Sequence, residues 1–197
     1  MSKLTIDDIV DMRAYERERD EFRSRIIELK GRRRVHVGPF VTFVFENRDT
    51  IRFQIQEMAR AEKILTDEGI ESELRAYNPL IPDPGNLSAT MFIELTTEAQ
   101  LREWLPKLIG IERNLELRVG ADGEAITATL DPDHEKQLTS DEVTASVHYI
   151  GFALSAAQID KVATGPVVLA IVHPEYEHEL VLSEGTRNEL LCDLQGS

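Results

Sequence analysis

The N-terminal third of the chain shows two helical patterns followed by one continuous apolar run. Apolar residues recur at helical spacing at Ile6, Ile9 and Val10 and again over residues 22–29, which predicts one long helix or two shorter ones ending at Gly31. The densely charged stretch between these positions is typical of a solvent-exposed helix face.

The apolar run at residues 40–45 is broken by a single threonine, which predicts a central strand covered on both faces. The run leads into a second predicted helix, from Thr50 to Glu68, which Gly69 would end. The apolar seam of this helix comprises Ile51, Ile55, Met58 and Leu65.

Two stretches of the C-terminal half, residues 89–130 and 147–182, share the order strand, helix, strand, turn, strand. In each stretch a hydroxyl residue that can cap the helix, Thr97 or Ser155, is followed by similar residues. A duplicated β-α-β-β unit is one interpretation, and two unrelated units of an ordinary type are the other. The polar segment 131–144 between them is predicted to be a loop.

Because hairpins interrupt the alternation of strands and helices, the predicted fold class is α+β (mixed α/β), with helices packed on a mixed or largely antiparallel sheet. We expect a single domain over residues 1–197. Residues 1–86 would hold the N-terminal helix, the central strand and the second helix, and residues 87–197 the two units. A last helix is predicted from Glu184 to Leu194.

The formal net charge of −14 narrows the range of partners, since nucleic acid and anionic membranes would repel so acidic a chain. The single cysteine, Cys192, forms no disulfide within the chain and argues against an iron–sulfur cluster held by this chain alone. Residues 1–12 lack the features of a signal peptide, and no apolar run approaches the length of a membrane span. We therefore expect a cytoplasmic protein that binds neither nucleic acid nor membranes.

Charged residues gather at two predicted helix ends. Arg32–Arg34 follow the first helix, where cations complement the helix dipole; the alternative is a contact with an anion or a partner. Glu46, Asn47, Arg48 and Asp49 lie between the central strand and the second helix, where helix-covered sheets often bind ligands. The alternative there is a helix cap with a local ion pair.

Glu62 and Gln54 lie about 40° to either side of the middle of the apolar seam. A buried glutamate needs an arginine, a metal, a proton or a partner chain, and the nearby arginines are the plainer answer. His148 and His173, with Glu46 or Glu62, would supply three ligands of a divalent-metal site if their strands are neighbours. The alternative is two strand histidines, each with its own hydrogen bond.

Six short stretches are distinctive: RVxxGP at 34–39, FENRDT at 45–50, QIQEM at 54–58, YNPLIP at 77–82, SVH at 146–148 and HP at 173–174. With them the chain resembles, nearly end to end, a bacterial family of domains of unknown function, number 3501. The resemblance implies a redox or peroxide-stress setting, because members are often encoded beside rubrerythrin-like proteins and iron–sulfur oxidoreductases. It also implies an accessory role, and this chain does not carry the two Glu-x-x-His motifs that a rubrerythrin's own di-iron site needs.

The favoured function is therefore an accessory or binding protein of a redox system, because dinucleotide, Walker-type and nucleophile-elbow motifs are absent. The alternative is a metal-dependent or small-molecule enzyme with its site near Glu46, Glu62, His148 and His173. A third interpretation, compatible with both, makes the N-terminal helix the dimerisation arm of a homodimer. The candidate ligand-binding residues are Glu46, Asn47, Arg48, Asp49, Gln54, Glu57, Tyr77 and Asn78, and the candidate ligands of a divalent metal are Glu62, His148 and His173.

Overall fold

A computed structural model of the chain describes residues 2–130 and 143–196. The α-helices are α1 (Met12–Arg33), α2 (Arg48–Glu62), α3 (Asp67–Tyr77), α4 (Glu98–Trp104), α6 (Ala156–Thr164) and α7 (Glu184–Gln195), and the short 3-10 helices are η1 (Ile6–Asp8), η2 (Asn78–Leu80) and η3 (Ile111–Arg113). The strands are β1 (Arg34–Val37), β2 (Val41–Glu46), β3 (Asn86–Ile93), β4 (Leu115–Val119), β5 (Glu124–Thr127), β6 (Thr129–Leu130), β7 (Val147–Ala153), β8 (Val167–His173) and β9 (Tyr176–Val181).

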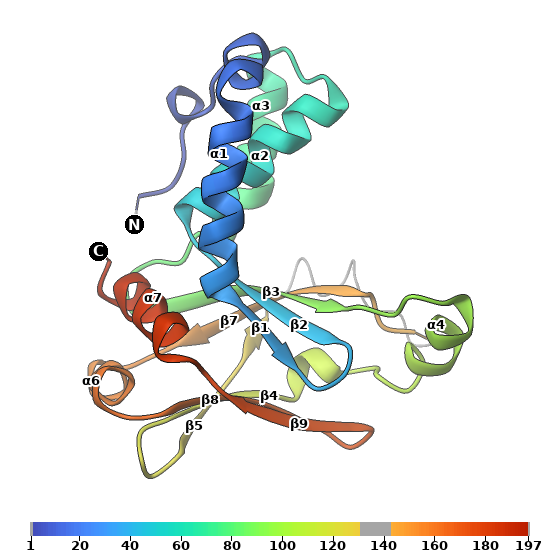
Figure 1. The fold of residues 1–197 in the computed structure, drawn as a ribbon, viewed down its shortest axis with the longest axis vertical. Coiled ribbons are helices and arrows are strands. Elements are labelled where there is room, and N and C mark those ends of the chain that lie inside the picture. Colours follow the sequence, from blue (N-terminus) through green and yellow to red (C-terminus); the bar gives the residue numbers. More distant parts are fainter. Residues whose placement is uncertain (1, 131–142, 197) are drawn as a thin grey trace.

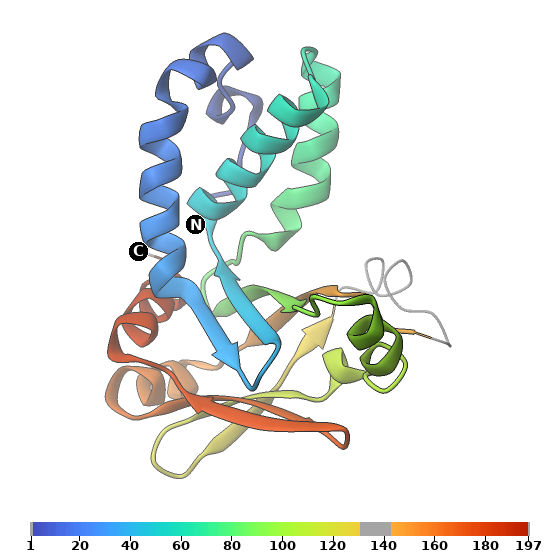
Figure 2. The same ribbon diagram turned by 45° about the vertical axis from the view of Figure 1, so that its right-hand side comes forward.

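Three helices stand on one side of two stacked sheets (Figure 1). We call α1, α2 and α3 the helical arm and the two sheets the sandwich; Figure 2 shows the arm rising from the sandwich in a second view. Among the described residues, no helix is long and apolar enough to cross a membrane.

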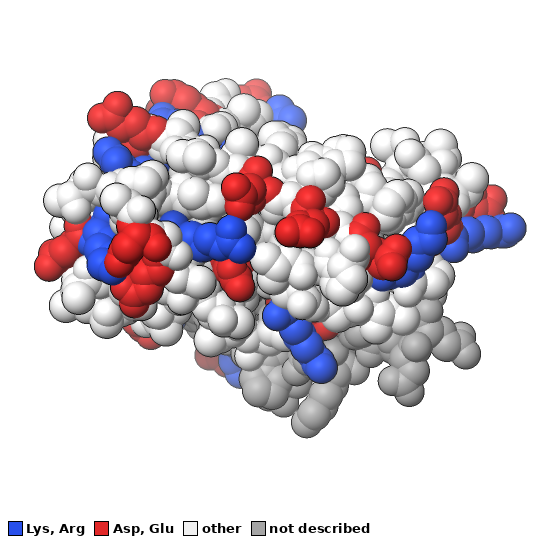
Figure 3. Space-filling view, turned by 90° about the horizontal axis from the view of Figure 1, so that it is seen from below, with Lys and Arg blue, Asp and Glu red and all other residues white. Residues whose placement is uncertain are grey.

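Sheet A has the strand order β1-β2-β3-β7-β6 and sheet B the order β5-β4-β8-β9, and all the paired strands are antiparallel. Alternate residues of the strands face the space between the sheets, where they form the main hydrophobic core. The predicted α+β class with largely antiparallel pairing is thus confirmed. Figure 3 shows the molecule from below, on the side of sheet B, where acidic and basic side chains are interspersed.

Both predicted β-α-β-β units are present: β3, α4, β4 and β5 form the first, and β7, α6, β8 and β9 the second. β3 pairs with β7 in sheet A and β4 pairs with β8 in sheet B, so the units meet strand against strand in both sheets. The two predicted caps also form, since Thr97 and Gln100 make a capping box at α4, as Ser155 and Gln158 do at α6. A shared origin of the two units stays a prediction.

The second predicted helix is in fact two helices. α2 ends at Glu62, because Lys63 adopts the left-handed conformation with φ of 56°. α3 begins after Thr66, whose side chain accepts a hydrogen bond from the N–H of Gly69. Gly69 therefore lies inside α3 instead of ending a helix. Thr66, a residue type that often caps helices, indicates the start of a new helix here, although the apolar pattern runs on across it.

The first predicted helix continues past Gly31 to Arg33 and leads directly into β1, a strand that the apolar pattern does not predict. One glycine costs an internal helical turn only about 1 kcal/mol, and the buried contacts of Arg33 described below hold the last turn in place. The predicted strand 125–130 divides, with β5 in sheet B and β6 in sheet A. The predicted loop 131–144 lies outside the described residues except for Val143 and Thr144.

Candidate functional site

The outer face of sheet A, which is turned away from sheet B, carries a row of small polar residues. Glu46 on β2 is opposite Ser88 on β3, Ser88 is opposite Gly151 on β7, and Gly151 is opposite Thr129 on β6. These four positions therefore form one line across four strands. The residues next to them in each strand, such as Phe45, point to the opposite face of sheet A and into the main core.

A groove of about 460 Å³ lies over part of this row. Its floor includes Ser88, Gly151 and Thr129, and its other side is the segment 79–83. Lys3 fixes that segment, because its Nζ donates to the carbonyl oxygen of Ile81 at 2.5 Å and lies 3.5 Å from the carboxylate of Asp83. In the described part of the chain the hydroxyls of Ser88 and Thr129 have no hydrogen-bond partner, so both are available to a bound molecule.

Glu46 lies at one end of the row and is 7% exposed. Its Oε1 accepts a hydrogen bond from Thr90 Oγ1 at 2.7 Å. Burial raises the pKa of Tyr149, and the charges of Tyr77 and Glu46 raise it further. Of the predicted candidates, Glu46 is thus the one opposite Ser88 of the groove floor, and Tyr149, whose pKa responds to Glu46 and Tyr77, lines the groove.

The other three residues of the strand-to-helix corner have local roles. The side chain of Asn47 accepts the N–H groups of Asp49 and Thr50 at 3.1 and 3.0 Å and so caps α2. Arg48 donates to the carboxylate of Asp8 at 2.5 Å, and Asp49 is exposed. The cap of the alternative interpretation is therefore present, whereas the ion pair of Arg48 is made with Asp8 of η1 and not within the corner.

Two further candidates hold the arm together. Glu57 accepts a hydrogen bond from the Tyr15 hydroxyl at 2.7 Å and two from Arg19 at 2.8 and 2.9 Å. The side chain of Asn78 binds both the N–H and the carbonyl oxygen of Leu4, each at 2.9 Å. These bonds join α1 to α2 and the N-terminal segment to η2, and η2 also supplies Pro79 and Leu80 to the wall of the groove. The remaining candidate, Gln54, is half-buried on α2.

Glu62 is exposed, contrary to the expected position beside a buried seam. The seam ends early because α2 stops at this residue and Lys63 turns the chain away. No arginine pairs with Glu62 among the described residues. Its charge instead adds to the effect of burial in raising the pKa of Glu73 on α3.

The two candidate metal-binding histidines are held separately. Nε2 of His148 lies 2.8 Å from the carbonyl oxygen of Ala145 and 3.0 Å from Thr144 Oγ1, and burial lowers the pKa of its imidazole. Nε2 of His173 lies 3.2 Å from the carbonyl oxygen of Ile109. Within residues 2–130 and 143–196, no group of three His, Cys, Asp or Glu side chains is placed to hold a metal ion. The structure therefore does not bring Glu62, His148 and His173 together.

The three consecutive arginines Arg32–Arg34 bind groups of this same chain. Arg33 is fully buried, and it donates to the carbonyl oxygen of Phe45 at 2.8 Å and to the carboxylate of Asp193. Arg32 pairs with Glu189 on α7 at 2.7 Å, and Arg34 lies 3.7 Å from Glu94. The carboxylates that the triplet binds thus come from this chain.

Sequence reasoning missed Ser88, Thr90, Thr129, Tyr149 and Gly151. One signal was available, because Ser88 and Thr90 alternate with the apolar Leu87, Ala89 and Met91, and a period of two indicates a strand with one polar face. The pairing of β6 with β7, which adds Thr129 to the row, joins two strands of sheet A that lie far apart in the chain, and it has no local signal.

Comparisons with known proteins place the chain in a family. No curated protein is a significant match. The crystal structure of a novel protein of unknown function from Burkholderia pseudomallei K96243 is similar, with 37% sequence identity and a TM-score of 0.91 over 98% of this chain and 100% of that chain. The family model described as "Protein of unknown function (DUF3501)" matches residues 3–194. The chain therefore belongs to the DUF3501 family, the one that its sequence motifs resemble.

Proposed function

We propose that this protein is an accessory binding protein and that the groove over sheet A receives a segment of its partner. The observation that carries the proposal is that the hydroxyls of Ser88 and Thr129, on either side of Gly151 in the groove floor, have no partner among residues 2–130 and 143–196. Binding sites are concave and combine apolar walls with a few placed polar groups, and this groove has both features.

The groove floor favours an uncharged hydrogen-bonding occupant. Ser88 and Thr129 are two strands apart, which corresponds to roughly 10 Å. Each hydroxyl can donate and accept, and the opposite side of the groove includes apolar residues such as Leu80 and Pro82. An extended peptide meets these requirements, because it presents an N–H and a carbonyl oxygen at every residue.

The class of partner comes from the family resemblance, which implies a redox or peroxide-stress setting. The partners to test are a rubrerythrin-like protein and an iron–sulfur oxidoreductase. The net charge of −14 favours a partner with a basic surface around the inserted segment. Light scattering of the isolated protein tests separately whether α1 forms a homodimer.

The test is isothermal titration calorimetry with each purified redox protein. Thr129→Trp should fill the groove and weaken binding at least tenfold. Thr127→Trp is the matched control, because Thr127 is an exposed threonine on β5 outside the groove, and it should leave the affinity unchanged. Equal binding by both variants would show that the groove is not the site, and no binding of either redox protein to the unsubstituted chain would refute the partner class.

A further inference from the structure

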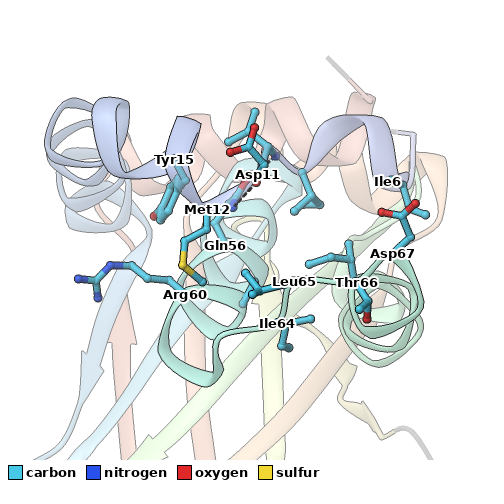
Figure 4. Close-up of a pocket in the computed structure, with 14 residues that line it drawn as sticks. Ile6, Asp11, Met12, Tyr15, Gln56, Arg60, Ile64, Leu65, Thr66 and Asp67 are labelled. Carbon is cyan, nitrogen blue, oxygen red and sulfur yellow. Dashed lines mark hydrogen bonds between the residues drawn. The ribbon is translucent and has the colours of Figure 1, made fainter.

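A second concave site lies in the helical arm, apart from the groove. It is a pocket of about 160 Å³ between the η1–α1 corner, the C-terminal half of α2 and the turn that joins α2 to α3 (Figure 4). Its apolar walls include Ile6, Ile9, Met12, Ile64, Leu65 and Ile70. The proposed partner-binding function does not use this pocket.

Most polar side chains of the pocket are already engaged, and Asp67, which also lines it, is exposed to water. The Gln56 amide accepts the N–H of Val10 at 2.8 Å and donates to the carbonyl oxygen of Val10 at 3.2 Å. The Tyr15 hydroxyl donates to Glu57, and Arg60 donates to Glu16 at 2.5 Å. A polar ligand would lose its bonds to water without gaining replacements from these groups, whereas an apolar ligand loses nothing.

Size then limits the ligand. An apolar cavity of about 150 Å³ in another protein binds benzene, so this pocket has room for one aromatic ring. Leu65 lines the pocket and yet is 76% exposed, so a molecule in the pocket would remove part of this large apolar side chain from water. We infer that the pocket binds a free, compact apolar molecule of about the size of a single aromatic ring.

Benzene is the probe for this inference. We expect a titration followed by methyl NMR to give saturable shifts confined to the methyl groups that line the pocket, such as those of Met12, Ile64 and Leu65. The absence of saturable shifts would overturn the inference. The same shifts produced by raising the protein concentration without benzene would also overturn it, because a second copy of the chain would then be the occupant.

Two alanines of α2 supply a matched pair of variants. Ala59 lines the pocket and is buried, whereas Ala61 is exposed on the same helix. Ala59→Met should fill the pocket and weaken benzene binding at least tenfold, and Ala61→Met should leave it unchanged. If Ala59→Met does not fold, Leu65→Ser at the exposed rim carries the test, with weaker binding expected in a folded protein. Unchanged binding in Ala59→Met or Leu65→Ser would contradict the inference.

Discussion

The sandwich and the helical arm are stabilised by different kinds of contact. One continuous hydrophobic cluster fills the space between the two sheets, whereas the arm has two smaller clusters, one under α2 and α3 and one around Tyr15, Phe22 and Ile26. Small clusters remove less apolar area from water and so contribute less free energy of folding. The arm adds directional bonds, such as those of Glu57 with Tyr15 and Arg19.

The comparison indicates where single substitutions act. Truncating a side chain in a hydrophobic cluster costs free energy in proportion to the apolar area and the cavity it leaves, and its neighbours relax only partially. The stabilising effect of a buried ion pair or of a turn with a special backbone conformation depends on one residue. Substitutions of single residues that join the arm to the sandwich, close the sandwich or hold the arm should therefore have distinct effects.

Arg33 at the junction of arm and sandwich should give the largest effect. It binds the carbonyl oxygen of Phe45 on β2 and the carboxylate of Asp193 on α7, and it is fully buried. Arg33→Met leaves the buried Asp193 without its partner, so we expect the free energy of unfolding to fall by about 3–5 kcal/mol. Urea denaturation measures this loss.

The neighbouring Arg32 is the control. Its side chain is 46% exposed and pairs with Glu189 and Glu28 on the surface. Arg32→Met should cost less than about 1 kcal/mol. Similar losses for the two variants would show that burial of Arg33 is not what joins the arm to the sandwich.

The contacts of Arg33 also show why part of the fold was beyond local sequence reasoning. Arg33 and Asp193 are 160 positions apart, and no periodicity connects them. The central strand and the caps at Thr97 and Ser155 were predictable because apolar runs and helix caps are local signals. The turn at Lys63 was not, because it depends on a left-handed conformation in a residue type that rarely adopts it.

Some residues of the candidate site were also predictable from local sequence, and others were not. Glu46 and Tyr77 were predicted from a strand-to-helix corner and a motif, and both contribute to raising the pKa of Tyr149. Ser88, Gly151 and Thr129 become neighbours only through the pairing of three strands that are distant in the sequence. A single sequence does not give strand order, so this row was not predictable.

Gly38 tests the closure of the sandwich. Its φ is 74°, and an added Cβ would lie 2.4 Å from the hydroxyl oxygen of Tyr176 and 2.6 Å from the ring of His178. Because that hydroxyl donates to Val37, Gly38→Ala combines backbone strain with a lost bond, and we expect a loss of about 2–3 kcal/mol in thermal unfolding. Gly31→Ala, inside α1 and in open space, should instead stabilise by about 0.5–1 kcal/mol.

Glu57 tests the polar contacts of the arm. Its hydrogen bonds with Arg19 and then Tyr15 lower the pKa of the carboxyl from 4.5 to about 2. Glu57→Gln should therefore reduce the free energy of unfolding by about 1–2 kcal/mol at neutral pH. Since the native pKa is the lower one, this contribution is complete above pH 4.5 and is lost as the pH falls toward 2.

Urea denaturation at several pH values checks this dependence, and the curves of the variant and the unsubstituted protein should converge in acid. Glu16→Gln is the control, because within the described part of the chain Glu16 makes one ion pair, with Arg60, and its side chain is 48% exposed. Its cost should stay below about 0.5 kcal/mol. A constant difference between Glu57→Gln and the unsubstituted protein from pH 7 to pH 2 would contradict the assigned pKa.

Substitution of Lys63 should give the smallest change in the free energy of unfolding, and this change should be a gain in stability instead of a loss. It ends α2 with φ of 56°, a conformation that glycine adopts without steric cost. Lys63→Gly should therefore raise the free energy of unfolding by about 0.5–1 kcal/mol, less the flexibility that glycine adds to the unfolded chain. Lys63→Ala removes the same side chain but keeps the strained backbone, so thermal unfolding should show no gain for it. A gain of equal size in both variants would assign the effect to the lysine side chain and not to the left-handed turn at the end of the arm.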